Sequence, residues 1–593
     1  METVKRHATP LGATAVLVLA LGCYLNTLGH GFVNWDDGKL ILENEHVRGL
    51  TLENLRHIWT QPIHETYLPL RATSYALDYS LWGGYDPMGF HLTNVVLHGV
   101  VSLLVFAIAR RLTGSDAAAL FSGVLFAVHP VCTEPVAWAS GRKDLLSTAL
   151  LLGAYLAYLG ARGLPRTSAA EMPAGEGSAE PIGSVLTGIS VGLFFFSGLA
   201  KAMVVTLPVF IVMTDFVFGG TGRGRWKRLL PVWAAYLAAA AVLTWVAMHF
   251  AASAGAIRPW HFGGPGRTAL FMSWVALYYV KTMAWPNFLS ARYPYGDTAD
   301  FGVPEWQVYA APFVLALSVA ALAVVFWKAR AGGRWPAWGK VTAFGFGWFF
   351  VALMPVMNII PIQVLVADRY LYLPSVGWAL ASGGLLWYAW GGRSDDGYGR
   401  RRRIAAAVVF VALAAGASAR TVSRNMVWRD SLSLWSSVVE EFPDSAYARR
   451  LLADAYIRYW PPDEESALRE LAIAEELDPD SGRANLARAI LYRRMGLTEK
   501  ALDERAIGMY RVGRIEYQKG NFDDARGYYM LALDVRPFHR GALLGLARVE
   551  IESGRPGGAR AALERLLEAD GQDEDALRLL NVIDNAGQGD QND

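Results

Sequence analysis

Two adjacent carboxylates stand where the first long apolar stretch of the sequence ends. Residues 32–37 read Phe-Val-Asn-Trp-Asp-Asp, so Asp36 and Asp37 follow closely on two aromatic side chains. A carboxylate at such a boundary can serve as a general base for a hydroxyl group, or it can hold a divalent cation. A purely structural alternative is that Asp37 caps a short helix beginning near Lys39.

Ionisable residues are concentrated again in residues 129–144, between two other apolar stretches. This segment contains His129, Glu134, Arg142 and Lys143. Arg142 and Lys143 both donate charge-assisted hydrogen bonds, which suits them to a phosphate group at a membrane interface. Alternatively, the two cations anchor the chain by extending their charged ends toward water.

Further charged residues stand beside later apolar stretches. Lys201 has no acidic neighbour in the sequence, Arg292 follows an apolar segment, and Asp368 and Arg369 directly precede one. These residues become candidates for the same polar site if the intervening segments bring them to one side of a membrane.

Three polar residues, His91, Asn94 and His98, fall on one face of a predicted helix because they are spaced by three and seven positions. Polar groups inside a membrane helix are costly and usually face protein or a wet cavity. His91 and His98 lie about 10 Å apart along such a helix, which is too far to share one ion. We therefore expect hydrogen bonds between helices here, with His91 as a candidate for a cavity wall.

Roughly 20 apolar residues cross a bilayer as a helix, and the sequence predicts eleven such segments. They are residues 9–29, 92–112, 117–136, 144–161, 182–200, 203–219, 229–250, 308–327, 341–361, 371–390 and 404–420. The basic loops favour a cytoplasmic N-terminus, because Lys and Arg are enriched in cytoplasmic loops. All basic loops face the cytoplasm only if a further apolar segment, 268–286, does not cross, so we expect that segment to be re-entrant or interfacial.

Eleven crossings bring distant charged residues to the side of the membrane opposite the cytoplasm. The expected cavity there combines carboxylates with several cations: Asp36, Asp37, Arg142, Lys143, Lys201, Arg292 and Arg369. An enzyme that acts on a phosphate-linked lipid needs such a site, because cations offset the phosphate charge and a carboxylate activates the nucleophile.

The composition divides the chain into a membrane part and a soluble part. Of 593 residues, 53% are hydrophobic and only 18% are charged, and the charged ones are densest near the C-terminus. We expect a membrane domain at 1–421 with an extracytoplasmic loop at 31–90, a soluble domain at 430–585, and a disordered tail at 586–593. The sequence has no basic patch with interleaved aromatics, which argues against nucleic acid as a partner, and its two cysteines form no zinc motif.

Small residues recur with a period of 34 in the expected soluble domain. Gly520 and Gly554 are 34 residues apart, as are Ala525 and Ala559, and Gly496 begins a similar but shorter unit. This period predicts about four tetratricopeptide (TPR) repeats, helix pairs that stack into an α-solenoid with a concave groove. Such a groove suits a peptide or a partner protein; the alternative is a structural cap without a ligand.

Six segments, in order along nearly the whole chain, match motifs of one family. They are FVNWDDGKLILEN (32–44), YLPLRATSYALDYSLWG (67–83), GFHLTNVVLH (89–98), LFAVHPVCTEPVAWASGRKDLLS (125–147), LAKAMVVTLPVFIVMTD (199–215) and DRYLYLPSVG (368–377). The chain resembles the transmembrane and TPR-repeat-containing O-mannosyltransferase-like family, within the GT-C superfamily of membrane glycosyltransferases. It departs from the family where Cys132 replaces a frequent His, and where Ala202 and Asp368 replace frequent Glu residues.

The resemblance implies an all-α, GT-C-like membrane domain followed by a TPR solenoid, acting as an inverting glycosyltransferase. The donor would be a polyprenyl-phosphate-linked hexose, with mannose expected, and the acceptor a Ser or Thr hydroxyl of a protein that the TPR groove helps to bind. The catalytic carboxylate would be Asp36 or Asp37; we favour Asp36 as the base and Asp37 as its orienting partner, and any divalent cation would bind to this pair. The donor phosphate would contact Arg142, Lys143, Lys201 and Arg369, in a cavity also lined by His91, His129, Glu134, Arg292 and Asp368.

Two other functions fit the same residues. One is a non-catalytic, membrane-anchored TPR scaffold, which would tolerate loss of Asp36. The other is a GT-C enzyme that decorates a surface glycan or a lipid. In each case we expect a multi-pass protein of the cell membrane, with the N-terminus cytoplasmic and the TPR domain extracytoplasmic, which means periplasmic in a bacterium.

Overall fold

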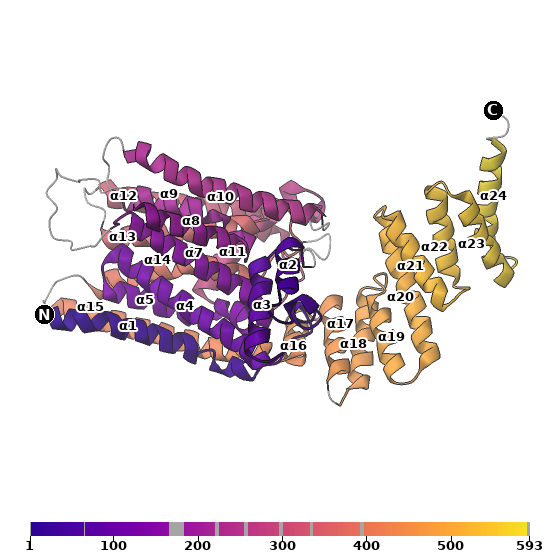
Figure 1. Ribbon diagram of the computed structural model, residues 1–593, viewed down its shortest axis with the longest axis horizontal. Helices are drawn as coiled ribbons and strands as arrows, with labels where there is room; N and C mark the ends of the chain where they lie inside the picture. Colours follow the sequence, from indigo (N-terminus) through magenta and orange to yellow (C-terminus); the bar gives the residue numbers. More distant parts are fainter. Residues whose placement is uncertain are drawn as a thin grey trace. The chain divides into compact units, whose positions relative to one another are not determined.

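The computed structural model of the chain consists of helices joined by loops (Figure 1), and it describes residues 2–63, 66–164, 183–219, 225–253, 259–295, 301–331, 336–391, 397–459 and 461–589. The chain divides into two compact units, Met1–Leu434 and Trp435–Asp593. Apart from one isolated bridge between Ile63 and Thr66, the described residues form no strand. The predicted all-α architecture is therefore correct.

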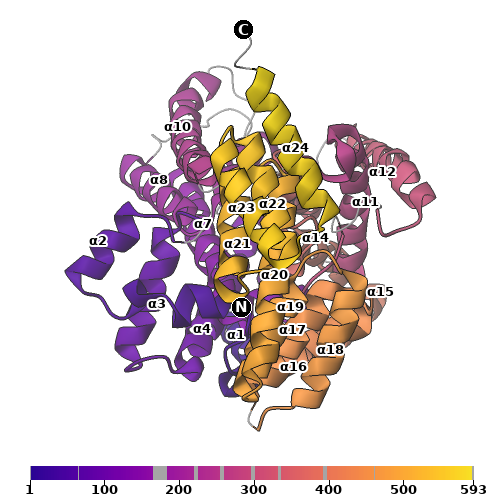
Figure 2. The same ribbon diagram turned by 90° about the vertical axis from the view of Figure 1, so that its right-hand side faces the viewer.

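The first unit is a bundle of long helices, seen from the side in Figure 1 and from one end in Figure 2. They are α1 (Glu2–Gly22), α4 (Pro87–Thr113), α5 (Asp116–Ala127), α7 (Arg142–Ala161), α8 (Ser184–Gly198), α9 (Leu207–Val217), α10 (Arg225–Ser253), α11 (Pro265–Ala284), α12 (Glu305–Ala331), α13 (Ala337–Leu353), α14 (Tyr372–Trp390) and α15 (Gly397–Asn425). Local sequence sets helix ends. The side chain of Asp86 caps α4 by accepting from the Met88 N–H (3.1 Å), and Gly114 ends this helix with a φ of 64°.

Seven helices of the described residues are long and apolar enough to cross a bilayer: Thr9–Gly29, Pro87–Thr113, Ala139–Ala161, Lys227–Ser253, Glu305–Val324, Ala337–Val356 and Gly399–Trp428. Asp116–Ala127 and Pro130–Ala137, bent by 51°, can form an eighth crossing. The chain is therefore a multi-pass membrane protein. Three of the eleven expected spans, 182–200, 203–219 and 371–390, are not in this set. A break around Lys201 leaves α8 and α9, which correspond to the first two, shorter than a full crossing.

The segment predicted not to cross forms α11, which is not among the seven helices. Its first turn lies near the start of α12, since Arg267 is 3.9 Å from Glu305. Its last turn lies beside the end of α5, where His129 Nε2 is 3.0 Å from the Met283 carbonyl oxygen. These contacts join the two ends of α11 to α12 and to the end of α5.

The segment between α1 and α4 folds into a small helical layer with its own apolar core. It contains η1 (Leu25–Gly29), η2 (Gly38–Leu42), η3 (Glu45–Val47), α2 (Leu52–Thr60) and α3 (Pro69–Leu81). Ile41, Ile58 and Tyr75 of this layer pack against Phe90 of α4 and Ala139. Because this core includes bundle residues, the layer has a defined position at one end of the bundle.

The second unit is a helical-repeat array whose helices pack in sequence order (Figure 1). Its helices are α17 (Ala446–Arg458), α18 (Glu464–Leu477), α19 (Arg483–Arg494), α20 (Thr498–Gln518), α21 (Phe522–Val535), α22 (Arg540–Glu552), α23 (Pro556–Ala569) and α24 (Glu574–Gly589), while α16 (Ser431–Glu441) spans the boundary of the units. The small residues act as the period predicts: Ala525 and Ala559 are fully buried, and a Cβ atom on Gly513 would come within 2.9 Å of the Tyr529 ring.

The shorter unit that begins at Gly496 has a structural explanation. Only one helix, α20, lies between Gly496 and Gly520, whereas two helices, α21 and α22, lie between Gly520 and Gly554. At the other end, α24 continues to Gly589. The expected tail from residue 586 is therefore wrong for 586–589, and 590–593 lie outside the described residues.

Candidate active site

The adjacent aspartates lie in residues 31–37, which we term the aspartate turn. Contacts from distant parts of the first unit hold it in position. The Asn34 N–H donates to Ser431 Oγ (2.9 Å), and the ring of Trp35 stacks on that of Trp138 with centroids 4.8 Å apart. The turn therefore belongs to a tertiary site and is not an isolated loop.

Asp37 is a buried carboxylate with both oxygens engaged. One accepts from the Val33 N–H (3.0 Å), and the other accepts from the Ser140 N–H (3.0 Å) and from the Ser140 hydroxyl. Burial raises the pKa of Asp37 to about 6, although these hydrogen bonds act to lower it. The alternative that this side chain caps the helix beginning at Gly38 is wrong, because it makes no capping hydrogen bond there.

Asp36 has different surroundings, although it is the next residue. Its side chain is partly exposed, and among the described residues it makes no hydrogen bond or ion pair. Its charge nevertheless acts on two cations, Lys143 and Arg71. Asp36 is thus a carboxylate near positive charge whose oxygens remain open to another molecule.

Arg142 is not placed as the sequence led us to expect. Its side chain is fully buried and forms an ion pair with Asp78. It also donates to Asn94 Oδ1 (2.9 Å) and to the Phe90 carbonyl oxygen (2.7 Å). With its donors directed to these groups, Arg142 joins α7 to α3 and α4 and does not face a phosphate. Its predicted role as a phosphate ligand is therefore not supported.

Arg369 lies beside the aspartate turn and is paired with Glu134. Its Nη1 is 2.6 Å from Glu134 Oε1, and its backbone N–H donates to Oε2 (2.7 Å). Its guanidinium carbon also lies 5.7 Å from the centroid of the Trp35 ring and 5.8 Å from that of Trp138. The two distant motifs that contain Trp35 and Arg369 therefore meet, as predicted.

Lys201 reaches the same region from the break between α8 and α9. It forms an ion pair with Asp144, which follows Lys143 in the sequence. Its Nζ also lies 5.7 Å from the ring centroid of Tyr370, a residue that contacts Arg369 by the same kind of interaction. The structure therefore brings Lys201 and Arg369 into one cluster with the aspartate turn.

Lys143 is the one predicted phosphate ligand for which the described residues provide no carboxylate partner. Its Nζ lies 5.8 Å from the centroid of the Trp138 ring. The charged groups that act on it include Asp36, Arg369 and Arg71. Lys143 and Asp36 are thus neighbours of opposite charge that are not bonded to each other, with Trp138 beside them.

The polar face of α4 forms hydrogen bonds between elements, as predicted. Asn94 donates to the Trp138 carbonyl oxygen (2.9 Å), and His98 lies 3.0 Å from the Tyr372 hydroxyl. His91 Nε2 is 3.4 Å from the Gly31 carbonyl oxygen at the start of the aspartate turn. This contact shows that His91 supports the aspartate turn.

His129 lines a different space. It borders a cavity of about 660 Å³ between α5, α11, α14 and α15, whose lining is largely apolar and includes Trp285, Trp378 and Arg420. The sequence places His129 only five residues before Glu134, so this cavity adjoins the segment that carries the Arg369 partner.

Asp368 and Arg292 belong to a second polar group next to Arg369. Asp368 is buried and accepts from the Tyr293 hydroxyl (2.7 Å). Arg292 precedes that tyrosine, and its carbonyl oxygen accepts from Ser290 (3.0 Å). These contacts bring the segment after α11 to the start of α14.

A divalent cation on the aspartate pair does not fit the geometry. Both Asp37 oxygens already accept hydrogen bonds, and within the described ranges no group of three or more His, Cys, Asp and Glu residues is arranged to hold a metal ion. We therefore assign no metal-dependent step to this site.

Sequence reasoning missed two residues, Ser140 and Arg71. Ser140 holds Asp37 in place, and its neutral side chain gave no signal for that role. Arg71 is 2% exposed, and among the described residues its only hydrogen-bond partner is Thr66. A cation in the middle of an otherwise apolar motif, PLRAT, was the signal that could have identified it.

Comparisons with known proteins match separate parts of the chain. The family model described as Tetratricopeptide repeat matches residues 516–583. Protein O-mannosyl-transferase Tmtc1 of Drosophila melanogaster is 43% identical over 166 residues, which cover 27% of this chain and 19% of that relative. Tmtc2 of the same species is 44% identical over 169 residues (27% and 18%), and human TMTC4 is 35% identical over 161 residues (24% and 22%). The match thus spans less than a quarter of the length of these relatives.

Two solved structures are also similar to the chain. ArnT from Cupriavidus metallidurans, bound to undecaprenyl phosphate, has a TM-score of 0.34 at 15% identity, covering 93% of this chain and 79% of that one. The oligosaccharyltransferase of Archaeoglobus fulgidus has a TM-score of 0.36 at 13% identity, covering 74% and 59%. By sequence, the chain is homologous over about a quarter of its length to the TMTC protein O-mannosyl-transferases, and its second unit contains tetratricopeptide repeats.

Proposed function

We propose that the chain is an inverting glycosyltransferase that moves a hexose, with mannose expected, from a polyprenyl phosphate to a Ser or Thr hydroxyl of a protein. One observation carries this proposal: Asp36 is an open carboxylate among cations, in a cluster where the neighbouring carboxylates Asp37, Glu134 and Asp144 all have partners. The names of the relatives support the choice of sugar and acceptor.

The reaction follows from the placement of Asp36 beside Lys143. Asp36 accepts the proton of the acceptor hydroxyl as its oxygen forms a bond to the anomeric carbon of the sugar. The bond between that carbon and the phosphate oxygen breaks, and polyprenyl phosphate leaves with the bonding electrons. Lys143 offsets the charge that develops on the leaving group. A single displacement of this kind inverts the anomeric configuration.

The paired cations have a different task in this proposal. Glu134 and Asp144 fix the positions of Arg369 and Lys201, and each cation keeps further N–H groups that can donate to the donor phosphate or sugar. Asp37, held by Ser140, orients the backbone that presents Asp36. The apolar cavity beside His129 has a lining suited to the isoprenoid chain of the donor.

The distribution of basic residues supports an extracytoplasmic site. Arg110 and Arg111 lie in the last turn of α4, at the other end of that helix from the layer that contains Asp36. Residues 400–403 lie at the start of α15, whereas the other end of α15 reaches the end of α1 through a hydrogen bond from Asn425 to the Cys23 carbonyl oxygen (2.8 Å). Basic helix ends favour the cytoplasm, so the aspartate turn faces away from it and the repeat unit is extracytoplasmic.

The repeat unit is proposed to bind the acceptor protein or a partner. Stacked TPR helices present an extended surface that suits an unfolded peptide segment. The occurrence of a repeat unit and a membrane unit in one chain supports this role.

The test is a transfer assay with the full-length protein in lipid nanodiscs, with undecaprenyl phosphate mannose as donor and a Ser/Thr-containing peptide as acceptor. Asp36→Asn removes the proton acceptor and should lower the rate by about 10²- to 10⁴-fold. Glu53→Gln, at an exposed position in the first turn of α2, is the matched control and should leave the rate unchanged. Transfer by Asp36→Asn at the wild-type rate would refute the proposed role of this residue.

The two alternatives give different results. If the acceptor is a glycan or a lipid, the peptide assay fails, but mass spectrometry of cells lacking the protein shows an altered surface polysaccharide or lipid and unchanged protein hexose. If the protein is a scaffold, the Asp36→Asn variant restores a deletion strain to the wild-type pattern of glycosylation.

A further inference from the structure

Arg71 occupies an unusual position for an arginine. It lies in the first turn of α3, which begins at Pro69. The adjacent Leu70 N–H donates to the Leu199 carbonyl oxygen (3.3 Å), two residues before Lys201. Only 2% of Arg71 is exposed. The cation is therefore buried at the point where the helical layer meets the break between α8 and α9.

The described residues provide Arg71 with few partners. Its Nη2 donates to Thr66 Oγ1 (3.2 Å), its Nε has no hydrogen-bond partner, and it forms no ion pair. Arg142 offers a direct contrast, because it is equally buried but pairs with Asp78 of the same helix as Arg71. A buried cation without a counterion is costly, so the fold keeps at Arg71 an arrangement that a bound anion would stabilise.

The surroundings of Arg71 identify the place for such an anion. The carboxylate whose charge acts on Arg71 is that of Asp36. Lys143 is influenced by both Asp36 and Arg71. Arg71 and Lys143 are thus two cations without carboxylate partners near one carboxylate, Asp36, whose oxygens are open.

We propose that Arg71 is a phosphate-binding residue, and that with Lys143 it holds the phosphate of a polyprenyl phosphate beside Asp36. This inference rests on the proposed function and identifies the cation that sequence reasoning assigned to Arg142. The planar guanidinium suits two phosphate oxygens at once. As the bond from the sugar to the phosphate breaks, the phosphate gains a second negative charge, and the pair Arg71 and Lys143 offsets it.

The test measures binding and not transfer, so that it stays informative if no glycosyl donor is ever accepted. Full-length protein in detergent is titrated with undecaprenyl phosphate and, in parallel, with undecaprenol, which has the same chain without the phosphate. Arg71→Met and Lys143→Met should each weaken undecaprenyl phosphate binding by about ten- to a hundredfold, the range expected for loss of a charged hydrogen bond. Neither change should alter undecaprenol binding.

Two further variants show that the effect belongs to the guanidinium. Arg71→Lys keeps the positive charge but loses the planar guanidinium group, so it should bind undecaprenyl phosphate more tightly than Arg71→Met but less tightly than the wild type. Arg56→Gln removes an exposed arginine of the same helical layer and should bind both lipids like the wild type. An Arg71→Met protein that binds undecaprenyl phosphate normally, or that loses both lipids equally, overturns the proposal.

Competition with inorganic phosphate distinguishes the source of the anion. If the site recognises a lipid phosphate, millimolar inorganic phosphate should displace undecaprenyl phosphate only weakly, because the isoprenoid chain adds affinity. Displacement at micromolar concentrations would show a site for free phosphate and would refute the assignment to the lipid. Failure of the proposed function has a separate signature, namely normal Arg71-dependent lipid binding without sugar transfer.

Discussion

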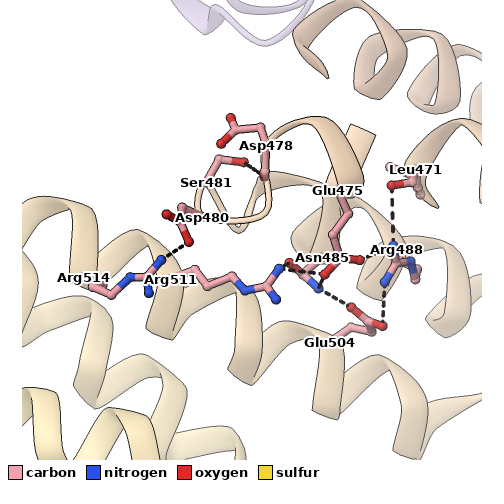
Figure 3. Close-up of polar contacts among 10 residues, drawn as sticks. All are labelled: Leu471, Glu475, Asp478, Asp480, Ser481, Asn485, Arg488, Glu504, Arg511 and Arg514. Carbon is pink, nitrogen blue, oxygen red and sulfur yellow. Dashed lines mark hydrogen bonds and ion pairs between the residues drawn. The ribbon is translucent and has the colours of Figure 1, made fainter. Parts of the chain in front are cut away.

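Clusters of arginine and carboxylate occur in both units of the molecule, but they differ in how completely their charges are paired. In the repeat unit, Glu475, Asn485, Arg488, Glu504 and Arg511 form a group that we term the repeat cluster (Figure 3). Arg488 lies 2.7 Å from Glu475 and 2.9 Å from Glu504, and Arg511 lies 2.6 Å from Glu475. Every charged member of the repeat cluster therefore has an opposite charge within ion-pair distance.

The candidate active site contains similar residues, but not all of its charged groups are paired. Three of its cations have carboxylate partners, in the pairs Arg142–Asp78, Arg369–Glu134 and Lys201–Asp144. Asp36, Asp37, Lys143 and Arg71 are left without an ion pair among the described residues, and of these two carboxylates only Asp37 has both oxygens occupied by hydrogen bonds. The comparison shows that the density of charge does not identify a reactive site, because a saturated cluster joins helices, whereas a cluster with open members can bind another molecule.

The largest effect on stability is expected at the most buried ion pair. Arg142→Met leaves the Asp78 carboxylate buried without its counterion, and should lower the free energy of unfolding by about 3–5 kcal/mol. Thermal unfolding of the full-length protein in detergent measures the change. The double variant Arg142→Met/Asp78→Asn should regain part of the loss, because no buried charge is then uncompensated.

Lys143→Met is the matched control for this experiment. Lys143 adjoins Arg142 in the sequence but has no ion pair to lose, so its replacement should leave the unfolding temperature nearly unchanged. Equal destabilisation by the two variants would contradict the distinction between paired and open cations.

The next effect concerns pH and Asp37. Burial raises the pKa of Asp37 from 3.8 to about 6, so the folded state binds this proton more tightly than the unfolded state. The stabilisation is complete below the unfolded pKa and is lost as pH rises through 6, by about 2–3 kcal/mol. Unfolding temperatures measured between pH 4 and 7 should therefore fall with rising pH more steeply for the wild type than for Asp37→Asn. Parallel profiles would show that Asp37 does not titrate in this range.

A smaller effect of opposite sign is expected in the repeat cluster. Burial would raise the pKa of Glu475, but hydrogen bonds from Arg488, Arg511 and Asn485 outweigh it and hold the pKa at about 2. The resulting stabilisation is present above the ordinary pKa of a glutamate and is lost as pH falls toward 2. Glu475→Gln should lower stability by about 1–2 kcal/mol at pH 7, measured as earlier proteolysis of the repeat unit in the full-length protein. Glu476→Gln, the next residue along α18, is the control.

The sequence predicted the fold class and the meeting of distant motifs, because both follow from patterns that are local. Apolar runs of fixed length identified the bundle, and the period of 34 identified the repeats. The expected convergence of Asp36 with Lys201 and Arg369 followed from counting crossings, and it is correct although the seven to eight clear spans are fewer than the eleven assumed. The number of spans was predicted less well than the meeting of these charged residues. Breaks such as the one at Lys201 shorten helices, but they do not move charged residues to the other end of the bundle.

The roles of individual cations could not be predicted, because they depend on contacts across the fold. Arg142 and Lys143 are adjacent and of like charge, yet one is buried against Asp78 and the other lies beside Asp36. The two side chains leave the start of α7 in different directions, and the side chain of Arg142 is the one that points toward α3. Arg71 was overlooked for the same reason: its lack of a counterion is a property of the folded chain and not of its neighbours in sequence.

The smallest effect on stability is expected at an exposed ion pair of the repeat unit. This pair tests whether ion pairing alone, without burial, stabilises the unit. Arg469 lies 3.1 Å from Glu465, one turn earlier on α18, with 62% and 88% of the two side chains exposed. Water screens such a pair, so Arg469→Gln should cost at most about 0.3–0.5 kcal/mol. A loss as large as that of Glu475→Gln would mean that pairing by itself stabilises the repeat unit. A negligible loss of stability here, together with a clear loss for Glu475→Gln, would show that an ion pair stabilises the fold where it is buried and shared between helices. A buried position is also where an unpaired charge such as Arg71 requires a ligand.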